Sequence, residues 1–278
     1  MAEQEPQAPK ALVPKAQVSG RRIVVGLDTS FMSREALALA ARVAASVDAD
    51  LNGIFVEDEN LLALSALPFA REISMAGAVS QMSEADMLRA MQAQAQIARR
   101  ILERTAKEAN IGWHFDIARG HRLAALAHHA NADDTLVIRA HDASRRDVGR
   151  TIRAATREVR ADVLLAARGV AVATTFATPD LRTVQTVLPE RVLLAVDEGS
   201  SPGEACVGFA QTLAARVGAP FRRLFARGFA PADLAIAARK AHAGLIVINA
   251  HALGDDDDAA HLSAAAGCPV LLLGGERK

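Results

Sequence analysis

Short runs of apolar residues alternate with amphipathic stretches along most of this chain. The runs are rich in Val, Ile and Leu and are bounded by turn residues, which is typical of buried strands. The stretches between them repeat apolar residues every three or four positions, which predicts helices. Strands that alternate with helices favour a parallel sheet with helices on both faces. The expected strands are 23–27, 51–56, 114–118, 134–140 and 163–167, followed by 192–197, 222–226, 245–248 and 268–273.

Two stretches of the first half differ sharply in their patterning. Residues 83–110 carry one helical stripe and predict a long helix packed on a core. Residues 58–83 contain many apolar side chains without a clean period, which predicts an irregular flap or a partner surface. Ser33 is expected to cap the first helix, and further helices are expected at 121–131 and 147–159. The stripe consists of Met87, Met91, Ala95, Ala98, Ile101 and Thr105, and the flap contains Leu61, Leu62, Leu64, Leu67, Phe69 and Ile73.

The order of motifs in the first half returns in the second half. Three pairs of predicted strand ends match: Asp28 with Asp197, Arg119-Gly120 with Arg227-Gly228, and Ala140-His141 with Ala250-His251. This repetition predicts a duplicated α/β unit, with the second copy shortened. The expected organisation is a disordered leader over 1–21, a first unit over 22–168, a linker over 169–190 and a second unit over 191–275.

Composition excludes several classes of function. The chain is 51% hydrophobic but only 4% aromatic, with no Tyr, which argues against a stacking platform for single-stranded nucleic acid. Its formal net charge is zero, so no global field attracts nucleic acid or anionic lipid. Cys206 and Cys268 are too few for a disulfide scaffold. Without a predicted signal or membrane-spanning segment, we expect a cytoplasmic protein with no nucleic-acid or membrane partner.

Candidate chemistry lies directly after the predicted strands, because ligands of open parallel sheets bind beyond the carboxyl ends of the strands. A carboxylate such as Asp28 at such an end accepts hydrogen bonds from a ribose or an amine, or else caps the following turn. The residues to weigh in the first half are Asp28, Thr29, Ser30, Glu57, Asp58, Arg119, His121, Arg139, His141 and Asp142. Their counterparts in the second half are Asp197, Glu198, Arg227, Asn249 and His251.

These motifs resemble the universal stress protein family. The run Ile23-Val-Val-Gly-Leu-Asp28-Thr-Ser is similar to the opening strand and acidic turn of that family, and Gly267-Cys-Pro-Val-Leu-Leu-Leu273 is similar to its closing strand. The resemblance covers 22–168 well and 191–275 in condensed form. It implies two parallel-sheet units of the Rossmann-like, adenine nucleotide alpha hydrolase-like fold. It also implies that Asp28 and Val56 match positions that contact a nucleoside.

The sequence departs from the nucleotide-binding members in one motif. Those members place Gly, two residues, Gly, nine residues and Gly-Ser or Gly-Thr after the fourth strand, which lets backbone amides approach phosphates. Here the first-half positions hold Arg139, Asp142 and Ile152-Arg153, and the second-half positions hold Asn249, Ala252 and Leu262-Ser263. No bound cofactor is therefore expected, with ATP or AMP as the less favoured alternative.

The two corresponding loops differ in charge. Residues 139–160 contain seven arginines, whereas 255–258 are four consecutive aspartates. Three interpretations remain open: solvated helix faces, docking of the two loops within or between chains, and an anion bound by the arginines. The candidate nucleotide or anion site consists of Asp28, Thr29, Val56, Arg139, His141, Arg145 and Arg146.

Signatures of catalysis and of metal binding are missing from the sequence. It contains no Gly-x-Ser-x-Gly elbow, Walker-type loop or Gly-x-Gly-x-x-Gly fingerprint, and the aspartate run lacks the spacing of a calcium loop. We therefore expect a non-enzymatic regulatory or stress-response binding module without a metal site. Its function would rest on a protein partner or self-association, including a homodimer, through the flap and the arginines. The alternative is a sensor of an adenine nucleotide or another small anion.

Overall fold

The computed structural model describes residues 21–67, 71–73, 77, 79–81, 83–139, 144–166, 191–254 and 257–274. The expected leader, apart from Arg21, and the expected linker lie outside these ranges. Within them, no helix is both long enough and apolar enough to cross a lipid bilayer.

Nine strands form one mixed sheet in the order β5-β2-β1-β6-β7-β11-β10-β8-β9. The first five belong to the first half of the chain and the last four to the second half. The first-half strands are β1 (Arg22–Leu27), β2 (Asp50–Asp58), β5 (Trp113–Gly120), β6 (Thr135–Arg139) and β7 (Asp162–Ala166). The second-half strands are β8 (Val192–Asp197), β9 (Phe221–Phe225), β10 (Ala243–Asn249) and β11 (Val270–Leu273). The predicted α/β class and the strand positions are confirmed.

The two halves of the sheet meet at a single antiparallel pair of strands. All neighbouring strands within each half are parallel, but β7 pairs antiparallel with β11, with Leu164 opposite Leu271. The carboxyl ends of the first-half strands therefore lie on one side of the molecule, and those of the second-half strands lie on the opposite side. That the halves arose by duplication stays a prediction.

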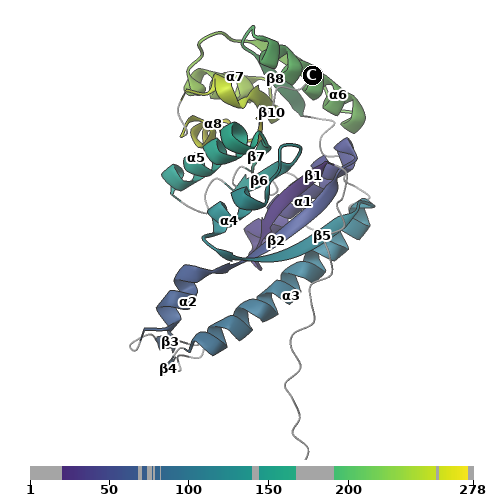
Figure 1. The fold of residues 1–278 in the computed structure, drawn as a ribbon. Coiled ribbons are helices and arrows are strands. Elements are labelled where there is room, and N and C mark those ends of the chain that lie inside the picture. The colour runs from purple at the N-terminus through teal and green to yellow at the C-terminus, as the bar shows by residue number, and fades with distance from the viewer. Residues whose placement is uncertain are drawn as a thin grey trace, which may run out of the picture.

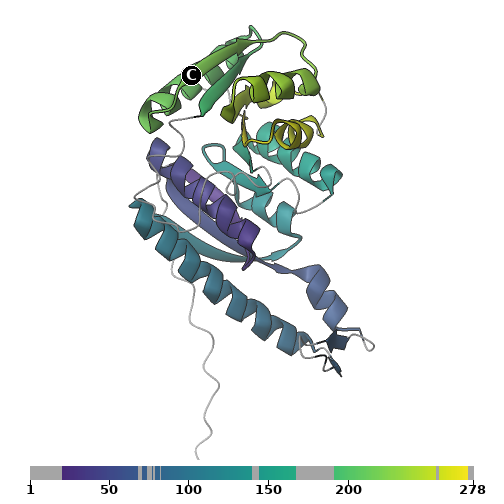
Figure 2. The same cartoon turned by 180° about the vertical axis from the view of Figure 1, so that it is seen from behind.

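Helices cover both faces of the sheet (Figures 1 and 2). One apolar layer joins the sheet to three long helices and also includes Leu62, and a second layer on the other face joins the sheet to four helices and a π-helix. The first group is α1 (Phe31–Val47), α3 (Glu84–Ala109) and α6 (Ser201–Val217). The second group is α4 (Arg122–His129), α5 (Arg145–Arg153), η1 (Ala154–Val159), α7 (Pro231–Lys240) and α8 (Asp258–Ala266). A 3₁₀ turn, η3 (Ala250–Ala252), follows β10.

The core is made mainly of Ala, Val and Leu, which allows the helices to approach the strands closely. Gly53 of β2 shows how closely: a Cβ atom at this position would lie 2.5 Å from Cδ1 of Leu27 and 2.7 Å from Cδ2 of Leu102. In α3 the predicted stripe residues Met91, Ala95 and Ala98 are buried, and so is Leu102, whereas the predicted Ile101 is only partly buried. The stripe therefore forms part of the core, as predicted.

The predicted irregular flap is wrong in detail. Residues 58–83 contain helix α2 (Glu59–Ser65) and a hairpin of β3 (Arg71–Ile73) and β4 (Val79–Gln81). Asp58 caps α2, because its Oδ1 accepts a hydrogen bond from the Asn60 amide at 2.9 Å. These elements are too short to produce a readable period. With the start of α3 they extend away from the sheet (Figure 1).

Two helix boundaries also differ from the sequence-based expectation. Ser30, rather than Ser33, caps α1, since its Oγ accepts a hydrogen bond from the Ser33 amide at 3.1 Å. The helix expected over 147–159 begins at Arg145 and continues from Ala154 as η1. Ser33 is buried in the first turn, where it serves the site described next.

Candidate functional site

The order of strands in the first half reverses between β1 and β6. Both neighbours of β1 are parallel to it, and the following connections leave the sheet in opposite directions from this point. Such a switch point is where ligands bind in open α/β sheets. Asp28 follows β1 and Arg139 ends β6, so the sheet brings these two candidate residues together.

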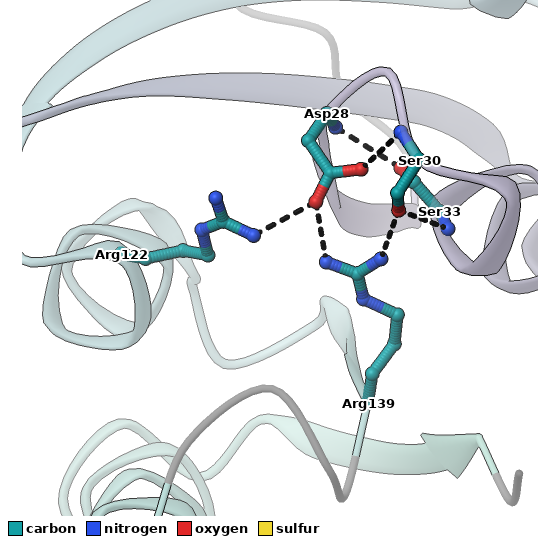
Figure 3. A network of polar contacts seen from close by, with 5 residues as sticks. All are labelled: Asp28, Ser30, Ser33, Arg122 and Arg139. Atoms are coloured by element: carbon teal, nitrogen blue, oxygen red, sulfur yellow. Dashed lines mark hydrogen bonds and ion pairs between the residues drawn. The ribbon is translucent and has the colours of Figure 1, made fainter. Parts of the chain in front are cut away.

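Five side chains at this switch point form one hydrogen-bonded network (Figure 3), which we call the Asp28 network. Oδ2 of Asp28 accepts hydrogen bonds from Nη2 of Arg139 at 2.7 Å and from Nη1 of Arg122 at 2.8 Å. Oδ1 accepts from the Ser30 amide at 2.8 Å. Arg139 also donates through Nη1 to Oγ of Ser30 at 3.1 Å, while the Asp28 amide donates to Oγ of Ser33 at 3.0 Å.

The network keeps the Asp28 carboxylate ionised. Burial by itself raises the pKa of this carboxyl group, but the hydrogen bonds from Ser30 and Arg139 and the charge of Arg139 outweigh it. Together they lower the pKa from 3.8 to about 2. The Arg139 side chain is only 6% exposed, and that of Asp28 is 18% exposed. The switch point is thus filled by an ion pair of the chain itself.

One small cavity lies next to this ion pair. A cavity of about 10 Å³ lies between β1, β6 and α4, with Gly26, Ala36, Arg122, Leu126 and Arg139 among its walls. A cavity needs roughly 10–15 Å³ to hold a single water molecule. This cavity is therefore large enough for about one water molecule.

The structure brings together only part of the predicted site. Asp28 and Arg139 are paired, and Thr29 lies in the turn between β1 and α1. Val56 of β2 is buried in the apolar layer that also contains Ala118 and Leu126. Arg145 and Arg146 begin α5, where Arg146 is exposed, and His141 lies outside the described residues.

Two of the arginines of 139–160 pair with different acids. Arg139 points to Asp28, whereas Arg150 lies 3.7 Å from Asp147 on the surface of α5. Helices α5 and α8, one from each half, are in contact, but Asp255 and Asp256 lie outside the described residues. Whether the two loops dock thus stays open.

Sequence reasoning missed two members of the network, Arg122 and Ser33. Arg122 is the first residue of α4, directly after the strand-end residue His121. A basic residue so close to a strand end was the feature of the sequence that could have indicated a partner for Asp28. The other strand-end residues also pair with each other: Arg119 donates to Glu57 at 2.9 Å, and Asn60 lies 3.2 Å from the ring of His121.

The equivalent switch point of the second half, between β8 and β10, uses different side chains. Asp197 is fully buried and accepts hydrogen bonds from the Gly199 amide at 2.7 Å and from Arg223 of β9. The Gly199 hydrogen bond and Arg223 hold the pKa of Asp197 below its usual value. Asn249 ends β10 and donates to Oε1 of Glu198 at 3.0 Å.

The two switch points are therefore satisfied by separate sets of partners. Ser200 also donates to Oε1 of Glu198, at 2.9 Å. Asn249 stands at the position that Arg139 has in the first half. Its neutral amide contacts Glu198, however, and not the strand-end Asp197. The described residues contain no group of three His, Cys, Asp or Glu side chains that could hold a metal ion.

Comparison with known proteins gives matches in structure alone. No protein-family model and no curated protein matches the sequence. A universal stress protein from Archaeoglobus fulgidus DSM 4304 superposes with a TM-score of 0.59 at 11% identity, over 92% of this chain and 97% of that chain. A functionally unknown protein from Pseudomonas aeruginosa PAO1 superposes with a TM-score of 0.53 at 13% identity, over 93% and 94%.

A third structure extends the same likeness. It is a candidate universal stress protein from Pseudomonas aeruginosa UCBPP-PA14, with a TM-score of 0.50 at 12% identity, over 93% of this chain and 94% of that chain. Each superposition includes both halves of the sheet. The chain thus has the universal stress protein fold.

Proposed function

We propose that this chain is a non-enzymatic regulatory or stress-response binding module of the cytoplasm whose first switch point takes no adenine nucleotide. The observation that carries this proposal is the ion pair between Asp28 and Arg139. A ribose hydroxyl or an amine that used Asp28 would have to displace a guanidinium group that is itself almost buried. Breaking a buried ion pair by removing one partner costs about 3–5 kcal/mol.

The residues after β6 support the same proposal. Three of the four positions of the glycine motif are described, and they carry Arg139, Ile152 and Arg153. Ile152 is buried in the core. Backbone amides approach phosphates most closely where no Cβ intervenes, and these positions lack that freedom.

A thermal-shift measurement with ATP, AMP and cyclic AMP tests this proposal. We expect the melting temperature to stay constant within the error, because a ligand stabilises only a folded state that binds it. A rise in melting temperature that is lost in Arg139→Ala would overturn the proposal. Arg119→Ala is the matched control, because Arg119 also ends a strand and pairs with an acid, Glu57, away from the switch point.

We further propose that the projecting segment of α2, β3 and β4, which we call the arm, binds a protein partner or a second copy in a homodimer. Leu61, Leu64 and Leu67 are three of the exposed large apolar residues of the described chain. They follow one another at helical spacing on and just after α2, which makes a continuous apolar stripe. Exposed apolar stripes of this kind mark interaction surfaces.

Leu64→Asp tests the role of the arm. Leu64 is 53% exposed, so this change should leave the melting temperature unchanged while it abolishes self-association or partner capture. Leu62 is 8% exposed and its replacement would unfold the segment. Light scattering that shows one unchanged mass for the wild type and Leu64→Asp, together with unchanged capture of a purified partner, would argue against the arm.

The alternative function, a sensor of an adenine nucleotide or another small anion, rests on α5. Arg146 is exposed and makes no ion pair with any described residue. A free guanidinium binds phosphate through charge and fork geometry. Calorimetric titration with ADP and with inorganic phosphate, for the wild type and Arg146→Ala, separates this function from the first: only the sensor predicts heat that the substitution removes.

A further inference from the structure

Strand β9 forms one open edge of the nine-stranded sheet. Its inner side pairs with β8: the Pro220 carbonyl accepts from the Leu193 amide at 2.8 Å, and the Ala226 amide donates to the Asp197 carbonyl at 2.9 Å. Backbone groups of successive residues in a strand point to opposite sides. The amide and carbonyl groups of the alternate residues Phe221, Arg223 and Phe225 therefore point outward, where no described strand pairs with them.

An exposed aromatic ring lies on this edge. Phe225 is 61% exposed, more than any other large apolar residue among those described. Its neighbours in β9 behave differently, since Phe221 and Leu224 pack against the two apolar layers of the core. The guanidinium carbon of Arg227 lies 5.6 Å from the centre of the Phe225 ring, which holds the charge beside the ring.

The same edge carries positive charge. Arg222 and Arg227 make no close ion pair with any described residue, and the charge of Arg227 acts on the buried Asp197 only at longer range. Arg223 is paired with Asp197, but that carboxylate is fully buried and does not face a partner. We call the outward backbone of β9, with Phe225, Arg222 and Arg227, the β9 edge.

The opposite edge of the sheet, strand β5, carries no excess of positive charge among its described residues. Arg119 lies 2.9 Å from Glu57, and His114 lies 4.0 Å from Asp50. Asp116 adds a negative charge to that strand. Ile117 is exposed there at the position that corresponds to Phe225 in the repeated motif. The two edges thus share their geometry and differ in their charge.

We propose that the β9 edge binds an extended acidic segment of a partner protein, which adds to the sheet as a tenth strand. Strand addition gives affinity through main-chain hydrogen bonds and specificity through alternate side chains. Acidic side chains of the segment face Arg222 and Arg227, and an apolar side chain covers Phe225. Open edges otherwise invite uncontrolled pairing, and the arginines restrict pairing to acidic segments. This surface goes beyond the proposed function, because it is separate from both the Asp28 network and the arm.

A peptide of about ten residues with alternating Val and Glu, roughly the length of a long strand, is the probe. Its fluorescence anisotropy is measured with the full chain. We expect saturable binding, at least about tenfold weaker binding of the matched Val–Lys peptide, and no binding of the Val–Glu peptide methylated on alternate amides. Equal binding of the methylated peptide, or of a single-stranded oligonucleotide, would show charge attraction alone and would overturn strand addition.

Two variants locate the binding. Phe225→Asp and Arg222→Glu should each weaken the Val–Glu peptide at least about tenfold while the melting temperature is retained. Ile117→Asp, the matched change on β5, should leave binding unchanged. Equal loss in Phe225→Asp and Ile117→Asp, or loss in neither, contradicts the assignment. A wild-type dimer that Phe225→Asp converts to a monomer would identify a second copy as the occupant and would overturn the acidic segment.

Discussion

Nη2 of Arg139 and Oδ2 of Asp28 lie 2.7 Å apart, at the point where the order of strands reverses between β1 and β6. The pair is hydrogen-bonded on both sides, through Ser30 to the start of α1 and through Arg122 to the start of α4. Polar groups that a ligand would use are thus already satisfied within the chain. Asp28 at the end of β1 thus links two helices and two strands. Replacing Asp28 should therefore lower the stability of the protein.

Asp28→Asn should lower the free energy of unfolding by about 2–3 kcal/mol, because it leaves two guanidinium groups beside a neutral amide. Urea unfolding followed by circular dichroism measures this loss. Asp48→Asn is the matched control: Asp48 also pairs with an arginine, Arg216, but that pair is exposed. Exposed pairs contribute about 0–1 kcal/mol. A similar small loss for both variants would show that the Asp28 network adds little to stability.

The stabilisation by Asp28 should depend on pH in the acid range. The pKa of this group is lowered from 3.8 to about 2 in the folded chain, so its contribution is complete above about pH 4 and is lost as the pH falls toward 2. We expect the difference in unfolding free energy between wild type and Asp28→Asn to shrink by about 2 kcal/mol over this interval. A difference that stays constant between these pH values would contradict the lowered pKa.

Gly53→Ala should destabilise the protein by about 1–3 kcal/mol, because the added methyl group overlaps Leu27 and Leu102 in a filled core. Gly208→Ala provides the comparison. Gly208 lies within α6, and no atom lies within 4 Å of the position of its Cβ. That variant should be more stable than the wild type by about 0.5–1 kcal/mol. Equal melting temperatures for the two variants would refute the close packing of α3 on β2.

Neither cysteine should react with Ellman's reagent in the folded chain. Burial, and for Cys206 also the nearby charges of Glu198 and Asp197, raise the pKa of both thiols to about 12. Only the thiolate reacts, and at pH 8 it would be about one part in ten thousand. Both thiols should become reactive in urea, which serves as the control. Rapid reaction of either thiol without urea would place it at the surface.

Much of the sheet could be predicted from the sequence, because parallel strands buried on both faces produce continuous apolar runs. Val192–Asp197 and Leu51–Val56 are examples, and both form strands. The arm could not be predicted in this way: α2 spans less than two helical turns and each hairpin strand has three residues, so no period is visible.

The Asp28 network could be predicted only in part. From the sequence we predict that Arg139 stands at a glycine position of the motif that the chain resembles, and that Asp28 follows a strand. The sequence does not show that the two side chains meet, because they are separated by 111 positions and only the order of strands makes them neighbours. The contribution of Arg122 was hidden for the same reason, at a separation of 94 positions. Motif comparison thus identified the altered position but not its partner.

The antiparallel pair of β7 and β11 has a consequence for synthesis on the ribosome. Leu164 of β7 pairs with Leu271 of β11, and β11 is synthesised after every other strand of the described chain. Domains fold as units while the chain grows, so the first half can fold early. Until β11 emerges, however, β7 remains an uncovered apolar edge, Val-Leu-Leu-Ala, of the kind that promotes aggregation. Slow translation of the second half would lengthen that exposure and with it the time during which the first half can aggregate.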